Sequence, residues 1–291
     1  MPEPIIVEAV RGDVVEAWHR VHAVAVADDR AVFSVGDPDL VTFLRSSAKP
    51  LQALPLVRAR PDLDNELIAI ACASHLAAPE QLAAVRRLLA LAPADEDELE
   101  CGPAPTAIEH NCSGKHAGFL AVCRVREWDS HGYHLASHPC QQAVLEEVAA
   151  AAGVEPVELE TGVDGCGVPT WALSLYQAAA TFGRLPSLDG GGRVVAAMLA
   201  HPEMLRGPVA ADVVLMRTLD GWVAKGGAEG LFCACSADGL GLALKVQDGA
   251  FRAVLPALAE VLRRLGRDPG ELGDVPLENS RGEQVGALAI A

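Results

Sequence analysis

Residues 43–57, FLRSSAKPLQALPLV, mark the point where the sequence changes from strand patterns to helix patterns. Pro50 suits the first turn of a helix, because the N–H groups there have no intrahelical partner. Ser46 would then be the N-cap, with Lys49 one turn above it on the same face. This geometry fits a Ser–Lys catalytic pair. It also fits an ordinary capped helix, which these residues alone favour because Ser-x-x-Lys often arises by chance.

On either side of this stretch the apolar pattern divides the chain into three parts. Residues 1–44 contain short alternating or apolar runs separated by Gly-Asp and Asp-Asp turns, which predicts a β-meander. Residues 46–220 carry apolar side chains at helical spacing, and PTWALSLYQAAATF is predicted as a helix beginning at Pro169. Strand character returns at 221, where ADGLG (237–241) predicts a hairpin turn. A helix in AFRAVLPALAEVLRRLG and a last strand in SRGEQVGALAI complete the chain.

Neither group of strands can bury a face alone, so we expect both to join in one antiparallel sheet with helices beside it. The prediction is a single domain over residues 1–291, of the α/β (α+β) class. Its sheet comes from about 1–45 and 221–291, and its helical region covers about 46–220. Ser46 would lie at the seam between the sheet and the helices.

The composition excludes several function classes. The 291 residues carry a formal net charge of −16, which argues against a nucleic-acid partner and against an anionic membrane surface. The N-terminus has no basic region and no long apolar core, so no signal peptide is predicted. No apolar run approaches the ~18 residues that span a bilayer. Eight cysteines without a CxxC are expected to be free thiols, and the predicted location is cytoplasmic.

Four further stretches are too polar and too rich in glycine to be simple connections. They are CASHLAAP (72–79), HNCSGKHAGFL (110–120), TGVDGCGVPT (161–170), and KGGAEGLFCA with ALKVQDG (225–249). In the second, Cys112 and Lys115 are one turn apart at the start of a helix, where the free N–H groups can lower a thiol pKa. They suggest a substrate or metal contact, whereas the ordinary explanation is a helix capped by Ser113.

The other stretches also allow two explanations each. Asp164 stands between glycines, either as a reactive carboxylate that a ligand can approach or as part of a turn. Ser74 and His75 follow an apolar run, as catalytic groups or as a satisfied buried pair. Lys245 stands inside an apolar strand, and a lysine there needs either water or a partner.

In this order, RSSAKPLQALPLV, CASH, HNCSGKHAGFL, GVDGCGVPTWALSL, AHPEMLRG, KGGAEG and ALKVQDG resemble the L-asparaginases of the thermolabile Rhizobium type. The similarity covers nearly the whole chain. It implies a fold similar to serine β-lactamases and glutaminases, a homodimer, and L-asparagine as the substrate. It also implies two Ser–Lys pairs, Ser46 with Lys49 and Ser74 with Lys245.

The resemblance further implies a zinc ion, accessory rather than essential, bound by Cys112, Lys115 and a later cysteine. That cysteine is expected just after GAEG, where this chain has Leu231. Cys233, two residues later, would point to the same face of the strand as Leu231.

Substrate contacts are implied at Arg45, Asp164, Asn111 and His116. L-Asparagine brings an α-carboxylate, which Arg45 can bind with two parallel hydrogen bonds, and an α-ammonium, with which Asp164 can pair.

A serine–lysine mechanism fits these residues. A lysine acts as a base only when neutral, so its pKa must fall from ~10.4, and two lysines in one pocket, Lys49 and Lys245, would lower each other's pKa. Ser46 would attack the amide with Lys49 as base, and Ser74 with Lys245 would relay the proton. The alternatives are another serine–lysine amidohydrolase, such as a glutaminase or a β-lactamase-like enzyme, and a non-catalytic metal-binding homologue.

Overall fold

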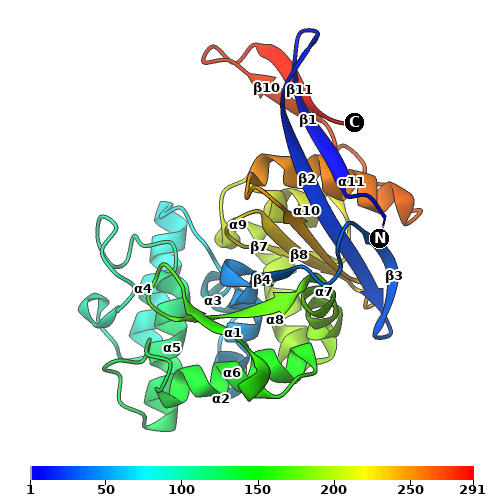
Figure 1. Cartoon of the computed structure of the whole chain (residues 1–291). Helices are drawn as coiled ribbons and strands as arrows, with labels where there is room; N and C mark the ends of the chain where they lie inside the picture. Colours follow the sequence, from blue (N-terminus) through cyan, green and yellow to red (C-terminus); the bar gives the residue numbers. More distant parts are fainter. Residues whose placement is uncertain (1) are drawn as a thin grey trace.

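The strands from the two ends of the chain form one antiparallel sheet, which confirms the predicted class (Figure 1). This computed structural model describes residues 2–291. The strand order is β10-β11-β1-β2-β9-β8-β7, and β3 pairs with β2 beside this path. The strands are β1 (Ile5–Arg11), β2 (Val14–Ala27), β3 (Arg30–Val35), β7 (Trp222–Gly226), β8 (Leu231–Ser236), β9 (Gly241–Val246), β10 (Val275–Glu278) and β11 (Gln284–Ile290).

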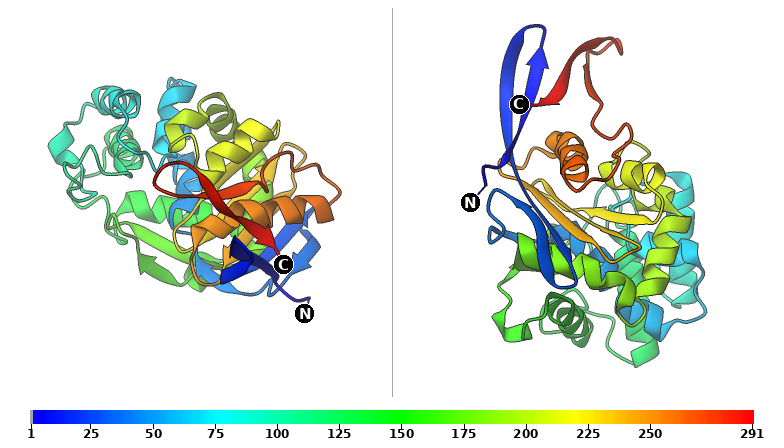
Figure 2. Two further views of the ribbon diagram at one scale, coloured as in Figure 1. Left: turned by 90° about the horizontal axis from the view of Figure 1, so that it is seen from above. Right: turned by 90° about the vertical axis from the view of Figure 1, so that its right-hand side faces the viewer.

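The sheet has two regions with different surroundings. The tip of the β1–β2 hairpin, with β10 and β11 beside it, extends beyond the helices, although α11 (Val254–Arg264) packs against β1 and β11. The second half of β2 pairs with β9 in the body (Figures 1 and 2). Burial follows this division, since Val14 and Trp18 are exposed and Val21 is fully buried.

The body of the sheet has an apolar core on each face, because successive side chains of a strand point to opposite sides. On one face Ala23 and Ala25 pack with α11 (Val254–Arg264), and on the other Val24 and Val26 pack with the helical region, including α7 (Leu175–Arg184). The predicted hairpin between β8 and β9 and the predicted last strand, β11, are both confirmed.

The middle of the chain is mainly helical, as predicted. Its longer helices are α2 (Leu54–Ala59), α3 (Asn65–Ala71), α4 (Pro79–Leu91), α5 (Ser113–Arg126), α6 (Pro139–Ala152), α7, α8 (Gly191–Ala200) and α10 (Ala211–Thr218). Its one-turn elements are η1 (Arg45–Ala48), α1 (Lys49–Gln52), η2 (Glu96–Glu98), η3 (Pro156–Glu158), η4 (Leu185–Ser187) and α9 (Pro202–Leu205), and η5 (Phe251–Ala253) precedes α11. Across residues 2–291, none of the helices combines the length and the apolar character needed to cross a membrane.

A small second sheet joins β4 (Val41–Phe43), which was predicted as a strand of the main sheet, to two strands that the apolar pattern does not predict. Its strand order is β4-β6-β5, where the other two strands are β6 (Pro169–Ser174) and β5 (Thr161–Val163). The prediction of a helix beginning at Pro169 is wrong, because α7 begins only at Leu175. Ser174 sets this start: its hydroxyl accepts a hydrogen bond from the Gln177 N–H, and the Gln177 side chain accepts one from the Ser174 N–H.

Candidate active site

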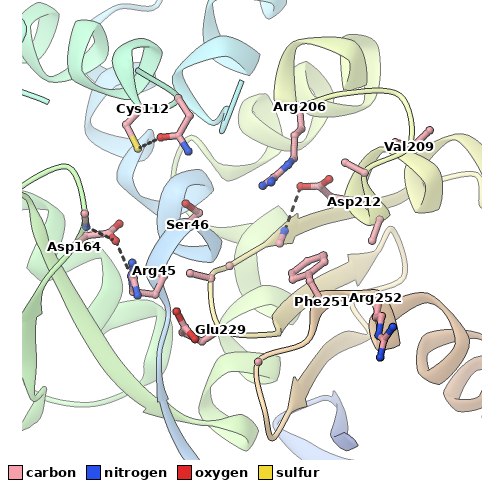
Figure 3. Close-up of a pocket in the computed structure, with 18 of the residues that line it drawn as sticks. Arg45, Ser46, Cys112, Asp164, Arg206, Val209, Asp212, Glu229, Phe251 and Arg252 are labelled. Atoms are coloured by element: carbon pink, nitrogen blue, oxygen red, sulfur yellow. Dashed lines mark hydrogen bonds and ion pairs between the residues drawn. The ribbon is translucent and has the colours of Figure 1, made fainter. Parts of the chain in front are cut away.

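A cavity of about 750 Å³ lies at the seam between the main sheet and the helical region, where the sequence places Ser46 (Figure 3). Segments far apart in the chain line it: η1, the start of α5, the β5–β6 loop, the segment from α9 to α10, the end of β7 and the start of α11. Its lining residues include Arg45, Ser46, His110, Asn111, Cys112, Asp164, Cys166, Arg206, Asp212, Gly226 and Gly227.

A local backbone feature turns the chain from β4 into the cavity. Arg45 has a φ of +49°, a left-handed conformation that is uncommon for residues other than glycine. Its N–H donates to Thr170 Oγ1 at 3.0 Å, and the Leu44 N–H donates to the Trp171 carbonyl at 2.9 Å. Strand β6 therefore stabilises the conformation that brings Ser46 to the cavity wall.

Ser46 does not act as a helix cap. Residues 45–48 form the short helix η1, and within the described chain no side chain caps its start. The α-helical turn begins at Lys49, with Pro50 in its first turn as predicted. The predicted N-cap at Ser46 is wrong, and its half-buried hydroxyl group faces the cavity (Figure 3).

Lys49 is completely buried beneath the cavity. Its Nζ donates hydrogen bonds to Ser74 Oγ at 2.9 Å and to the Ala73 carbonyl at 2.5 Å. The pKa of Lys49 is lowered to about 8, mainly by burial; a thiolate at Cys112 opposes this shift, and the ammonium groups of Lys115 and Lys225 contribute to it. A substantial fraction of Lys49 is therefore neutral near pH 8, as a general base requires.

The structure does not bring Lys245 to Ser74. Lys245 is half-buried on β9, where its Nζ donates to the carbonyl groups of Glu229 and Val246. Ser74, in the connection between α3 and α4, is buried, and its N–H donates to the Leu205 carbonyl at 2.8 Å. The lysine that contacts Ser74 is Lys49, so the pairing predicted for Ser74 and Lys245 is wrong.

A second buried lysine, Lys225 at the end of β7, was not predicted as a site residue. Its Nζ donates to Asp212 Oδ2 at 3.1 Å and to the Gly226 carbonyl at 3.2 Å, and both side chains of the ion pair are almost fully buried. Burial opposes the ionisation of Asp212, but the charge and hydrogen bond of Lys225 outweigh it and lower the pKa of Asp212. The apolar strand before KGG was the signal for Lys225, since a lysine in such a strand needs a partner.

The start of α5 contributes a group of sulfur and nitrogen atoms. Cys112 precedes α5, and its thiol contacts Asn111 Oδ1 at 3.2 Å and the thiol of Cys166. Lys115 Nζ lies 3.1 Å from Cys166 Sγ. The hydrogen bond from Cys166 lowers the pKa of Cys112 well below its usual value against the effect of burial, and the ammonium groups of Lys49 and Lys115 add to this.

This geometry changes the predicted metal ligands. Cys233 is buried in β8, where burial raises the pKa of its thiol to about 12 and the nearest hydrogen-bonding partner is Ser47. The sulfur that the structure brings to Cys112 and Lys115 is that of Cys166, so the choice of Cys233 is wrong. Leu231, which stands where a ligand was expected, is buried in the same strand.

The group around Cys112 partly suits a zinc ion. Residues 2–291 contain no group of three His, Cys, Asp or Glu side chains placed to hold a metal. Cys112 and Cys166 offer two sulfur ligands of the kind that zinc prefers. Lys115 can serve as a third only after losing its proton, and its pKa is raised because the thiolate charges outweigh burial. The donor atoms fit zinc if the metal displaces that proton.

Arg45 and Asp164 meet at one end of the cavity (Figure 3). Arg45 Nε donates to Asp164 Oδ1 at 2.6 Å, and the Gly165 N–H donates to the same oxygen at 2.8 Å. These bonds fix both side chains through Nε and Oδ1. The terminal guanidinium nitrogens and Oδ2 are the atoms that can still bind an α-carboxylate and an α-ammonium.

Of the other predicted substrate contacts, Asn111 lines the cavity and His116 does not. His116 lies inside α5, fully buried, and its Nδ1 is 2.8 Å from the Tyr133 hydroxyl. Burial lowers the pKa of His116 well below its usual value. His110, at the other end of the same motif, lines the cavity instead.

The comparison with protein families agrees with the motifs. A family model described as L-asparaginase II matches residues 7–290. A search of curated proteins found no match to the chain. Among solved structures, the chain is similar to the octameric penicillin-binding protein homologue from Pyrococcus abyssi, with a TM-score of 0.41 and 9% identity over 86% of this chain and 74% of that one.

Two other solved structures have similarly low TM-scores and sequence identities to this chain. A β-lactamase from Mycobacterium bovis has a TM-score of 0.39 and 16% identity over 84% of this chain and 94% of its own. The protein Mglu, in its native form in 4.3 M NaCl, has a TM-score of 0.38 and 16% identity over 84% of this chain. The chain spans 61% of the length of Mglu.

Proposed function

Because the chain belongs to the L-asparaginase II family, we propose that it hydrolyses the side-chain amide of L-asparagine to L-aspartate and ammonia through a serine–lysine mechanism. The observation that carries the mechanism is the burial of Lys49, in contact with Ser74, one helical turn from the serine that lines the cavity.

The two serines have different roles in this proposal. Ser46 is the nucleophile, because it is half-buried at the cavity wall, whereas only 1% of Ser74 is exposed. Neutral Lys49 accepts the Ser46 proton as the hydroxyl oxygen attacks the amide carbon. Ser74 relays that proton to the departing ammonia, and water then hydrolyses the aspartyl ester. Lys225 replaces Lys245 as the second cation, and its charge favours the neutral form of Lys49.

Substrate recognition rests on the end of the cavity formed by Arg45 and Asp164. The guanidinium group binds the α-carboxylate and the carboxylate binds the α-ammonium, so both charges of the amino acid are paired. Asn111 lines the same cavity and offers an amide for a polar contact. The choice between asparagine and glutamine depends on one methylene, which such pockets resolve by about 1–3 kcal/mol.

Zinc remains an accessory cofactor in this proposal. Cys112, Cys166 and deprotonated Lys115 would hold it, and when bound it would supply a fixed positive charge beside the cavity. The cysteines and Lys115 hold the start of α5 against the Asp164 loop.

We also propose that the protein is a homodimer, which light scattering after size exclusion would test.

The function is tested by measuring ammonia release from L-asparagine, with L-glutamine in parallel. The Ser46→Ala and Lys49→Met variants should lose activity. Lys245→Met should keep it, because the Lys245 ammonium bonds the backbone carbonyl groups of Glu229 and Val246. No ammonia from either substrate would overturn the proposal. Glutamine hydrolysis without asparagine hydrolysis would favour the glutaminase alternative.

A further inference from the structure

The cavity has arginine side chains at both ends. Arg45 lies at the end that the proposed function assigns to the amino-acid part of L-asparagine, and Arg206 lines the cavity from the segment between α9 and α10. Figure 3 shows Asp164 and Glu229 on the side of Arg45, and Arg206 on the opposite side of Ser46 with its guanidinium group directed into the cavity. An amino acid bound at Arg45 would leave the end at Arg206 free, because cavities of ~300–1,000 Å³ usually enclose drug-sized ligands and this one measures about 750 Å³.

The positive charge at this second end is not balanced by the protein. Arg206 and Arg252 both line it, and its carboxylate, Asp212, forms an ion pair with Lys225. Among residues 2–291, the Arg206 guanidinium forms no ion pair, and Figure 3 marks no hydrogen bond for it. A guanidinium group with free N–H donors suits a carboxylate, which it can bind through two parallel hydrogen bonds. The cavity therefore offers a second carboxylate site in addition to the one at Arg45.

The backbone beside Arg206 is fixed next to Ser74, the proposed proton relay. The Ser74 N–H donates to the Leu205 carbonyl at 2.8 Å. The next carbonyl, that of Arg206, accepts a hydrogen bond from Nε2 of the buried Gln81 at 2.8 Å. In the proposed mechanism Ser74 passes a proton to the departing nitrogen, so the position of Arg206 directly after Leu205 places it on the side of the leaving group.

We propose that Arg206 binds a carboxylate on the amine part of the substrate, so that the protein also hydrolyses β-aspartyl dipeptides, in which the side-chain amide nitrogen of asparagine belongs to a second amino acid. This inference rests on the proposed function. An ester forms between Ser46 Oγ and the β-carbonyl carbon, and the C–N bond to the second amino acid breaks. The departing amine takes the proton that Ser46 lost. Water then hydrolyses the ester, and the products are L-aspartate and a free amino acid.

The test compares β-L-aspartyl-glycine with β-L-aspartyl-glycinamide, which lacks the terminal carboxylate, and with L-asparagine. Release of L-aspartate is measured for all three on the same preparation. The parent protein should have a higher kcat/KM for the dipeptide than for the glycinamide derivative. Arg206→Gln should lower the ratio of kcat/KM for the dipeptide to kcat/KM for L-asparagine by about 10-fold, the low end for a hydrogen bond to a charged group. Arg206→Lys, which keeps the charge, should retain part of this ratio.

Two controls show whether the effect comes from the carboxylate. Arg206→Gln should change the ratio for the glycinamide derivative much less, because that substrate has no carboxylate to bind. Arg281→Gln, at a side chain that is 77% exposed and outside the cavity, should leave both ratios unchanged. Because Arg206 is itself exposed, its variants should fold like the parent protein.

The outcomes separate this inference from the proposed function. Hydrolysis of L-asparagine without hydrolysis of the dipeptide overturns the inference and leaves the function standing. Hydrolysis of the dipeptide with an unchanged ratio in Arg206→Gln, or with an equal loss for the glycinamide derivative, overturns the assignment to Arg206. Hydrolysis of none of the three substrates overturns the proposed function, and the inference with it.

Discussion

Lys49 Nζ lies 2.9 Å from Ser74 Oγ, so the lysine of the Ser-x-x-Lys motif contacts a serine in the connection between α3 and α4. The contact joins α1 to this connection beneath the cavity. Lys49 thus contacts Ser74 through the fold and follows Ser46 by three residues in the sequence. In the proposed mechanism, Lys49 and Ser74 carry the Ser46 proton to the departing ammonia.

Replacing Lys49 by methionine removes the proposed base and keeps a side chain of similar length. We expect kcat/KM for L-asparagine to fall by about 10²–10⁴-fold, the usual contribution of general base catalysis. Because methionine avoids burying an ammonium group, the melting temperature should not fall. A correctly folded Lys49→Met protein with parental activity would contradict the role of Lys49.

The lowered pKa of Lys49, about 8 instead of 10.5, predicts a pH dependence. A protonated lysine cannot accept a proton, so kcat/KM should rise with pH and level off above about 8. The kcat/KM profile reports the free enzyme, which is the state described here. A profile that is flat between pH 6 and 9, or that is still rising steeply at pH 10, would be incompatible with Lys49 as the base.

Asp164→Asn should raise KM for L-asparagine, because the amide cannot pair with the α-ammonium group. A hydrogen bond to a charged group contributes about 1.5–3 kcal/mol, which corresponds to about a 10- to 100-fold effect on kcat/KM. Asp189→Asn, at a carboxylate that is 86% exposed and outside the cavity, is the matched control. Equal kinetics for the two variants would exclude Asp164 from substrate binding.

Removing Asp212 should destabilise the protein, because it leaves the buried ammonium of Lys225 without its carboxylate. Breaking a buried ion pair from one side costs about 3–5 kcal/mol, so the free energy of unfolding of Asp212→Ala should fall by about that amount. Asp189→Ala should change it by less than about 0.5 kcal/mol. Urea unfolding measures both. Similar unfolding midpoints would show that the Lys225–Asp212 pair does not stabilise the fold.

The contacts of Cys112 and Lys115 with Cys166 predict which cysteine affects zinc content. Cys166→Ser should lower the zinc bound after purification, whereas Cys233→Ser should not, because Cys233 lies in β8 away from Lys115. Zinc per chain is measured by elemental analysis, and ammonia release is measured on the same samples after chelation. Activity should survive chelation if zinc is accessory. Loss of zinc in Cys233→Ser but not in Cys166→Ser would instead support the sequence prediction that Cys233 is a zinc ligand.

The antiparallel sheet and the helices beside it could be predicted from the apolar pattern. The strand segments alternate apolar and polar residues, and the helical segments repeat apolar residues about every 3.6 positions. The small sheet was missed for a local reason. β6 is a six-residue run directly followed by α7, so the two together have the apolar density of one long helix. The boundary depends on the capping bonds between Ser174 and Gln177, which periodicity does not detect.

The candidate site was predicted best where residues are close in sequence. Ser46, Lys49, Cys112 and Lys115 come from two short motifs, and the structure places each motif beside the cavity. Partners from distant elements could not be assigned by spacing. Lys245 was predicted as the partner of Ser74, whereas the structure brings Lys49 to it.

The most direct test of the central claim is to find which serine carries the acyl group. The protein is mixed with L-asparagine, quenched in acid within the first turnover, digested, and mapped by mass spectrometry. The account predicts an aspartyl ester on the peptide containing Ser46, and none in the Ser46→Ala variant. An aspartyl group on Ser74, or one that persists in Ser46→Ala, would contradict it.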